Sequence, residues 1–260
     1  MNETSVTFFG VGDGWPCDER KHSAFLYRFG QTRLLIDCGE PVSGSYKATG
    51  LSYDAIDGIF ISHLNFDHIA GFFMLLQGFW LEQRKSVLPV HLPAEGIEPI
   101  RRMLEAGYVF DELLPFKLQF APLKAGQAVV TGEVKVTAFP TTHLDHFRRA
   151  FHKKHPVGYE AFSFLLEAGR LRIAHSADLG VPEDLAPLLE KPLDLLVCEL
   201  AHFKAEDLFG YLRGRAIKRI AFIHLARAHW NNLKKIHRQA EKQLGGIPFS
   251  FAQAGEEMPL

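Results

Sequence analysis

The segment Ser62-His63-Leu64-Asn65-Phe66-Asp67-His68 places two imidazoles and a carboxylate directly after a short apolar run. Imidazole nitrogens and carboxylate oxygens together suit zinc, iron or manganese, whereas structural zinc sites are usually built from clustered cysteines. Because His63 and Asp67 are four residues apart and His68 follows directly, a turn after the strand can direct all three side chains at one centre. The segment therefore predicts a catalytic metal site at the end of a strand.

Four other segments also end a hydrophobic run with a potential metal ligand. A lone histidine or aspartate is usually a surface group or a hydrogen-bonded core residue. Several of them at strand ends can nevertheless converge on one point, because loops at one edge of a sheet lie close together. We therefore expect all five segments to meet at one metal centre. The four further segments are Leu35-Ile36-Asp37-Cys38-Gly39, Pro140-Thr141-Thr142-His143, His175-Ser176-Ala177-Asp178 and Phe222-Ile223-His224.

Short β-rich runs occur in both halves of the chain, and helical patterns follow each group. Two strand-rich halves, each followed by helices, indicate two sheets whose outer faces are covered by helices. The expected strands are 6–9, 24–29, 34–36, 58–62, 90–92, 134–138, 162–167, 171–175, 195–199 and 220–223. The expected helices are 69–81, 96–106, 183–190, 205–212 and 230–244.

With 260 residues, 47% of them hydrophobic, the chain can bury a large core, and we expect one domain over residues 1–260. Lysine and arginine total 29 against 30 for aspartate and glutamate, so no overall charge favours nucleic acid or a membrane as partner. Cys17, Cys38 and Cys198 are far apart without a CxxC pair, which favours reduced thiols in the cytoplasm. The sequence shows neither a secretory signal nor an apolar stretch of roughly 20 residues, so we expect no membrane partner.

In chain order, the five segments resemble the five signature motifs of the metallo-β-lactamase superfamily, and the resemblance covers nearly the whole chain. The superfamily motif HxHxDH corresponds to the stretch from His63 to His68. The opening stretch Phe9-Gly10-Val11-Gly12-Asp13-Gly14-Trp15-Pro16, followed by Arg20 and Ser23, is similar to ribonuclease Z and related phosphodiesterases. The resemblance implies an α/β fold, a four-layer αββα sandwich of two mixed sheets with helices on the outer faces.

The resemblance also implies a cofactor of one or two divalent metal ions, with zinc favoured and manganese or iron as alternatives. Asp37 matches the aspartate of the motif that precedes the histidine motif. The implied ligands are His63, Asn65 and His143 for one metal and Asp67, His68 and His224 for the other, with Asp178 bridging the two.

Position 65 departs from the superfamily pattern, because it is asparagine where the motif has histidine. An amide oxygen binds zinc more weakly than an imidazole does and suits manganese better, so a non-zinc or mixed centre is a reasonable hypothesis. Three arrangements are open. Asn65 ligates through its oxygen, a water replaces the missing nitrogen, or another histidine such as His146, His175 or His202 takes its place.

For activity, the resemblance implies a metal-dependent hydrolase that cleaves a phosphodiester or related ester with water activated by the metal. Asp67 would orient or deprotonate that water. His202 belongs to the run Cys198-Glu199-Leu200-Ala201-His202, where ribonuclease Z enzymes usually carry His-Glu-Ala-Thr. We expect His202 to act as an acid near the leaving group, and an exposed histidine at the start of a helix is the competing interpretation.

The expected substrate is a small-molecule or nucleotide ester, and RNA is the second possibility. A basic run from Arg148 to Lys154 can receive a phosphate chain or can be a solvated helix face. The long Gly/Pro-rich arm with which ribonuclease Z proteins hold transfer RNA has no counterpart between His143 and Asp178. Two alternatives to a small-ester hydrolase follow: a transfer-RNA 3′-processing endonuclease, and a degenerate, non-catalytic relative that binds a metal or ligand.

Overall fold

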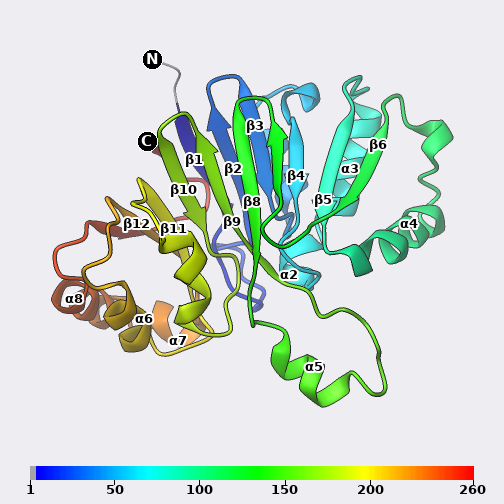
Figure 1. Ribbon diagram of the computed structural model, residues 1–260. Helices are drawn as coiled ribbons and strands as arrows, with labels where there is room; N and C mark the ends of the chain where they lie inside the picture. The colour runs from blue at the N-terminus through cyan, green and yellow to red at the C-terminus, as the bar shows by residue number, and fades with distance from the viewer. Residues whose placement is uncertain (1–3) are drawn as a thin grey trace.

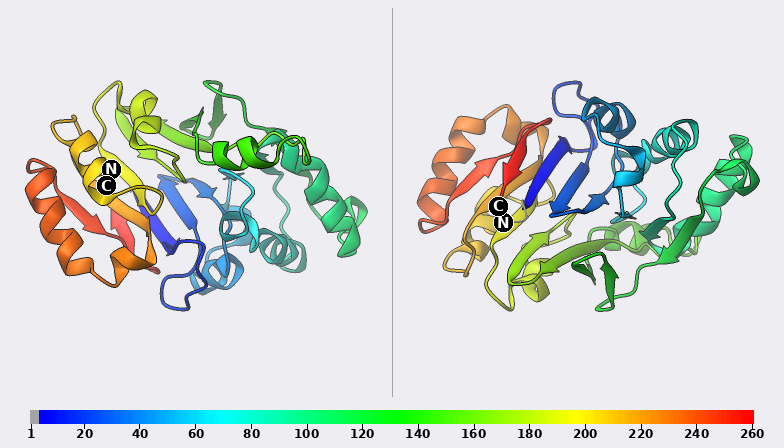
Figure 2. Two further views of the ribbon diagram at one scale, coloured as in Figure 1. Left: turned by 90° about the horizontal axis from the view of Figure 1, so that it is seen from below. Right: turned by 90° about the horizontal axis from the view of Figure 1, so that it is seen from above.

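Two seven-stranded β-sheets pack face to face, and helices cover their outer faces, in the computed structural model, which describes residues 4–260 (Figure 1). Viewed from below or from above, the first sheet, blue to green apart from the red β14, faces the second, green to red, and helices lie outside both (Figure 2). These four layers confirm the predicted αββα sandwich. That residues 1–260 act as one domain stays a prediction.

The first sheet is mixed, with strand order β14-β1-β2-β3-β4-β5-β6. β14, β1, β2 and β3 pair antiparallel, whereas β3 to β6 pair parallel, and helices connect the parallel strands. The strands are β1 (Thr4–Gly10), β2 (Ala24–Phe29), β3 (Thr32–Ile36), β4 (Gly58–Phe60), β5 (Leu88–Leu92), β6 (Leu118–Pro122) and β14 (Glu257–Pro259). The helices of this half are α1 (Val42–Ala48), α2 (Phe66–Ile69), α3 (Phe72–Leu81) and α4 (Ile97–Ala106), with short 3-10 turns η1 (Tyr53–Ala55), η2 (Ala94–Gly96) and η3 (Asp111–Leu113).

The second sheet is also mixed, with strand order β13-β12-β11-β10-β9-β8-β7. β7 to β10 pair antiparallel, and β10 to β13 pair parallel. The strands are β7 (Ala128–Thr131), β8 (Val134–Pro140), β9 (Phe162–Ala168), β10 (Leu171–His175), β11 (Leu195–Leu200), β12 (Ile220–Leu225) and β13 (Phe249–Phe251). The helices are α5 (Asp145–Phe151), the 3-10 helix η4 (Pro182–Leu189), α6 (Ala205–Leu212), α7 (Arg227–Trp230) and α8 (Leu233–Gln243).

Apolar side chains fill the space between the sheets and the space under the helices. Along β9, Phe164 packs into the core between the sheets, whereas the next residue, Leu165, packs under the helices. Leu196 and Val197 of β11 divide in the same way. Since successive side chains of a strand point to opposite faces, a strand covered on both faces is apolar at most positions. This explains the predominantly hydrophobic runs in the second half of the sequence.

The structure corrects several predicted element boundaries. The predicted helix 69–81 is divided into α2 and α3, because Gly71 lies against the end of β3 and donates its backbone N–H to the carbonyl oxygen of Cys38 at 2.9 Å. A Cβ at Gly71 would lie only 2.9 Å from that oxygen, so the close approach requires glycine. The predicted helix 230–244 is likewise divided into α7 and α8. Within residues 4–260, no helix combines the length and apolarity needed to cross a bilayer.

Arg84 joins three segments on the helix-covered side of the first sheet. Its side chain is only 1% exposed and donates to the carbonyl oxygens of Tyr53, Ile56, Ser86 and Val87. The guanidinium therefore satisfies backbone acceptors of η1, of the turn before β4 and of the turn before β5.

We expect Arg84→Met to lower the free energy of unfolding by about 3 kcal/mol, because it leaves several backbone carbonyl groups without a donor. Urea denaturation followed by circular dichroism measures this change. The matched control is Arg102→Met, which removes an exposed arginine of α4 and should shift the free energy by less than about 0.5 kcal/mol. Equal effects of the two substitutions would show that Arg84 does not stabilise the fold in this way.

Candidate metal centre

The predicted ligand residues lie where strands of both sheets end, near α2 (Figure 1). From the first sheet, the segment 62–68 follows β4 and includes α2. From the second sheet, His143 follows β8, Asp178 follows β10, and His224 lies close to the end of β12. The αββα packing thus brings together side chains that are more than 100 residues apart in the sequence.

Two groups of side chains are arranged so that each can hold a metal ion. In each group the candidate ligand atoms lie within 4.8 Å of one another. One group is Asp67, His68, Asp178 and His224, and the other is His63, His143 and Asp178. Asp178 belongs to both: its Oδ1 lies 3.3 Å from His68 Nε2, and its Oδ2 lies 3.3 Å from His224 Nε2. The same Oδ2 lies 3.7 Å from His143 Nε2 and 3.8 Å from His63 Nε2.

Several of these donor atoms are buried and lack a hydrogen-bond partner. They are Nε2 of His63, Nε2 of His68 and Oδ1 of Asp178. A buried polar atom without a partner costs about 1–3 kcal/mol, so such atoms in one place require an explanation. A divalent cation accepts electron pairs from imidazole nitrogen and carboxylate oxygen, and both donor types converge here. The residues therefore fit a metal, while their role as ligands stays a prediction.

Hydrogen bonds behind the ligands fix the orientation of the rings. Asp37 Oδ2 lies 2.7 Å from His68 Nδ1, and the same carboxylate accepts the Ser62 backbone N–H at 2.7 Å. Ser23 Oγ lies 3.1 Å from His224 Nδ1. Each ring therefore uses Nδ1 outside the centre and presents Nε2 to Asp178, which is the arrangement typical of metal-binding histidines. Asp37 thus orients the His68 ring through a hydrogen bond on the side away from Asp178.

The pKa values favour neutral imidazoles at His63 and His143 and an ionised carboxylate at Asp178, whereas the pKa of His68 is raised. Burial lowers the pKa of His63 well below its usual value and lowers that of His143 to about 4. Burial opposes charge on His68 as well, but Asp178 and Asp37 outweigh it and raise the pKa of His68. Burial raises the pKa of Asp178, yet the neighbouring His224 and His68 outweigh burial and lower it well below the usual range. Neutral imidazole and ionised carboxylate are the forms that bind metals.

The backbone is strained at three points around the centre. Asp37, Ala177 and His224 have φ values of 57°, 46° and 48°, in the left-handed region that favours glycine. Such a conformation persists only where the surrounding structure enforces it, and it is common at functional sites. This conformation turns the chain sharply just after β3, just after β10 and within β12. A candidate ligand or a residue that orients one lies at or next to each turn.

Asn65 lies at the edge of the centre, and its Nδ2 is 3.4 Å from His143 Nε2. Among histidine, cysteine, aspartate and glutamate side chains, the group that contains His63 has one donor fewer than the group that contains His68. Of the histidines considered as replacements, His202 lies nearest in geometry, with Nε2 3.8 Å from Asp178 Oδ2. His146 contacts the backbone oxygen of His143 at 3.0 Å, and His175 is buried with Nδ1 2.9 Å from the Tyr27 hydroxyl. All three arrangements at position 65 remain compatible with these contacts.

Glu199 holds His202 in place. The buried carboxylate lies 2.9 Å from His202 Nδ1 and accepts the backbone N–H groups of Leu179 and Ala201 at 2.9 and 2.6 Å. Burial alone would lower the pKa of His202, but the hydrogen bond with Glu199 and its charge outweigh burial and raise it to about 9. The side chain is 32% exposed with Nε2 3.8 Å from Asp178 Oδ2, and the residue as a whole is exposed just before α6, so the acid and the exposed histidine at a helix start both stay predictions. Whether His202 acts in catalysis stays a prediction.

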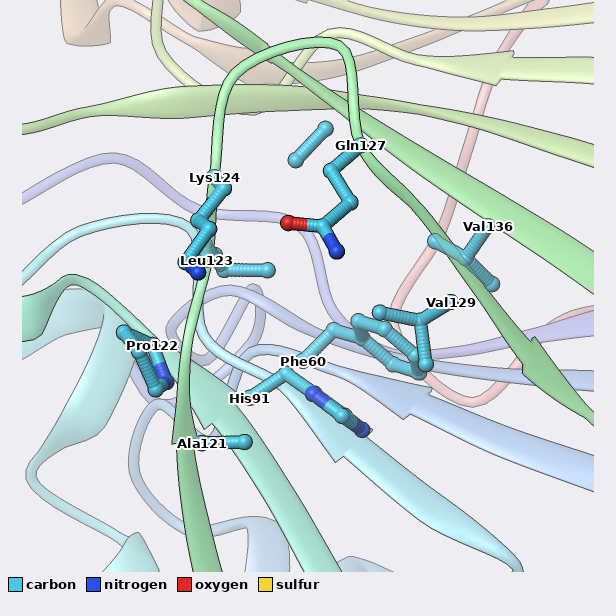
Figure 3. A pocket seen from close by; sticks show the side chains of 10 residues that line it. Phe60, His91, Ala121, Pro122, Leu123, Lys124, Gln127, Val129 and Val136 are labelled. Atoms are coloured by element: carbon cyan, nitrogen blue, oxygen red, sulfur yellow. The ribbon is translucent and has the colours of Figure 1, made fainter.

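A cavity of about 420 Å³ adjoins the centre on the side of His143 and His202, and Arg149 of α5 also lines it. A second cavity, of about 220 Å³, opens where the two sheets separate (Figure 3). Its walls include Phe60, His91 and Gln127, and it contains none of the candidate ligands. Only the first of these two cavities is therefore in a position to receive a substrate at the metal centre.

The fold is that of metallo-β-lactamase fold proteins, as the sequence motifs predicted, and the histidines and aspartates of those motifs come together in it. More specifically, residues 4–231 match the family described as "Anti-Pycsar protein Apyc1", and the chain belongs to that family.

Similar proteins agree with this assignment. Ribonuclease Z of Bradyrhizobium diazoefficiens is 31% identical over 182 residues, which cover 69% of this chain and 56% of that protein. The chain spans about half the length of the curated relatives that it matches. The metallo-β-lactamase fold protein YhfI of Bacillus subtilis has a TM-score of 0.80 at 18% identity, with 100% of both chains covered. The short form of human tRNase Z has a TM-score of 0.72 at 19% identity, with 98% of both chains covered.

We expect Asn65→His to raise the zinc affinity of the His63 group by about 10-fold or more, because it adds an imidazole where the group has a weaker donor. Competition with a chromophoric chelator measures the affinity of each site. Asn65→Ala is the companion variant: a loss of affinity would show that the amide oxygen ligates, and no change would favour water or His202. Unaltered zinc binding by Asn65→His would contradict the assignment of position 65 to this group.

Proposed function

We propose that this protein is a metal-dependent hydrolase that cleaves a phosphodiester bond in a small-molecule or nucleotide substrate. The single observation that carries the proposal is the buried Asp178 carboxylate, which two groups of donors share and whose Oδ1, like Nε2 of His63 and of His68, lacks a partner. Such a paired arrangement suits hydrolysis at two adjacent metal ions, which can stabilise both the attacking and the leaving oxygen. Zinc is the metal that we expect, with manganese or iron as alternatives.

The residues of the centre divide the chemical work. Asp67, His68, Asp178 and His224 would hold one ion, and His63, His143 and Asp178 the other. A bound ion would supply Lewis acidity, which polarises the phosphoryl group and makes water more acidic.

Asp67 and His202, at the edge of the centre, would transfer the protons in this reaction. Asp67 is partly exposed and can orient the attacking water and take its proton, while the water oxygen forms the new bond to phosphorus. On the other side, His202 donates the proton on Nε2 to the leaving oxygen as the phosphorus–oxygen bond breaks. Glu199, bonded to Nδ1, orients the ring and stabilises its protonated form. The products are a phosphate monoester and an alcohol.

Relatives named ribonuclease Z support phosphodiester chemistry, since a ribonuclease cleaves the phosphodiester backbone of RNA. We favour a small substrate over a transfer-RNA precursor, because the described residues between His143 and Asp178 form only α5, a loop and two strands. The three cysteines are free thiols, which agrees with the cytoplasmic location that we propose.

The test is a substrate panel with bis-p-nitrophenyl phosphate, cyclic nucleotides, a transfer-RNA precursor, lactones and thioesters, each with added zinc, manganese or iron. We expect hydrolysis of the small phosphodiesters, and a loss of about 100-fold or more in kcat/KM for Asp178→Asn. Cleavage of the transfer-RNA precursor alone would instead favour the processing endonuclease. If the metal-loaded protein cleaves nothing in the panel, the non-catalytic binding protein becomes the better description.

His202→Asn tests the assignment of the acid. We expect it to lower kcat by about 100-fold or more for a substrate with an alkoxide leaving group, and far less for a p-nitrophenyl ester, whose leaving group needs no proton. His237→Asn, on the exposed face of α8, is the control. Equal losses on both substrates, together with a lower metal content, would show that His202 is a metal ligand rather than the acid.

A further inference from the structure

The cavity between the two sheets lies apart from the metal centre and has no role in the proposed reaction (Figure 3). Its volume is about 220 Å³, and its walls come from the edge strands β6 and β7 and from the strands beside them. Small residues help to leave this space, because Ala121 of β6 lines it from the first sheet and Ala138 of β8 from the second. Unfilled space beside an apolar core lowers the stability of a fold, so this cavity requires an explanation.

One wall of the cavity carries a buried polar side chain, His91 of β5. It is only 9% exposed, and its ring stacks on Phe60 with the ring centres 4.7 Å apart. No residue within 4–260 forms a hydrogen bond with either nitrogen of this ring. Burial lowers the pKa of His91, so the ring is neutral near pH 7 and carries one N–H donor and one acceptor. Because buried polar groups normally have partners, these free nitrogens indicate that the cavity receives a polar group.

Two further polar side chains line the cavity from the loop between β6 and β7. Lys124 and Gln127 are exposed there, and neither side chain has a partner among the described residues. Figure 3 shows the Gln127 amide directed into the space between the sheets. None of the ten residues that line the cavity is acidic, and Lys124 is the charged one. Glu160 of a neighbouring cavity, which Lys124 also lines, accepts the backbone N–H of Ala94 at 3.0 Å. The cavity therefore favours an anionic group.

Backbone hydrogen bonds to both sheets hold this loop in place. At its start, Leu123 donates its N–H to the carbonyl oxygen of Leu92 in β5 at 2.8 Å. Further along, Gly126 donates its N–H to the carbonyl oxygen of Ala138 in β8 at 2.8 Å. The backbone that carries the two polar side chains is thus ordered before any ligand arrives, so binding would lose little affinity to ordering of the loop.

We propose that this cavity, called here the edge cavity, binds a small organic acid with a compact apolar body, of about the size of benzoate. An apolar cavity of about 150 Å³ can hold benzene, so the edge cavity has room for a ring and a carboxylate. The apolar body would lie against Phe60 and Val129. The carboxylate would accept hydrogen bonds from the His91 ring and the Gln127 amide, and the Lys124 ammonium would balance its charge.

Calorimetric titration of the zinc-loaded protein with benzoate, benzyl alcohol and benzylamine tests this proposal, because the three probes share a ring and differ in charge. We expect benzoate to bind about 10-fold or more tightly than benzyl alcohol, and benzylamine to bind least. Lys124→Met should remove most of this preference, as should His91→Phe, which keeps a ring on Phe60 without the nitrogens. Lys117→Met, an exposed lysine outside the edge cavity, is the control and should change nothing. Equal binding of benzoate and benzyl alcohol, or a preference unchanged in both cavity variants, would overturn the proposal.

A second measurement locates the bound acid, because a carboxylate can also bind zinc. In crystals soaked with 4-bromobenzoate, we expect the anomalous signal of bromine in the edge cavity. A signal at the metal centre alone, or no signal at all, would overturn the proposal. Ala121→Leu fills the edge cavity and should abolish benzoate binding, whereas Ala128→Leu, an exposed position of β7 outside the cavity, should not. Neither measurement requires hydrolysis, so failure of the proposed activity leaves this test unaffected.

Discussion

The burial of an ionised carboxylate, Asp178, at the junction of two sheets is the constraint on which the site depends. At 3% exposure this group has lost almost all of its hydration, which is very costly for a charge unless opposite charges or donors surround it. Imidazoles from both halves of the chain supply those partners. The strained backbone at Asp37, Ala177 and His224 is the conformational cost of bringing them there.

The two donor groups around that carboxylate are unequal. The group with Asp67 and His68 has four histidine or aspartate donors and the group with His63 has three, with asparagine rather than histidine at position 65. The chain belongs to the anti-Pycsar Apyc1 family and is similar to ribonuclease Z, so it shares its fold with several hydrolases. Fold alone does not determine substrate, so the proposal for this chain depends on its own residues at position 65 and at the Glu199–His202 pair.

Much of the fold and of the ligand set could be predicted from the sequence, because the responsible signals are local. The strands from β9 to β12 are largely buried on both faces and are apolar at most positions. The edge strands β6, β7, β13 and β14 escaped prediction because they are short and partly exposed, so their residues show no clear alternation. The break at Gly71 depends on a contact with Cys38, which no local pattern encodes. The motif order indicated the ligands, but the geometry at Asn65 and the hydrogen bonds of Glu199 arise only from tertiary packing.

The candidate ligands are divided between the sheets: His63 and His68 come from the first half of the chain, and His143, Asp178 and His224 from the second. An ion bound by both sets would add a cross-link between two halves that are also held together by apolar contacts between the sheets and by hydrogen bonds such as Ser23–His224 and Tyr27–His175. The layers could then not slide or separate before that coordination is released. A catalytic cation would therefore also stabilise the fold. The rate at which it dissociates would then limit the rate of unfolding.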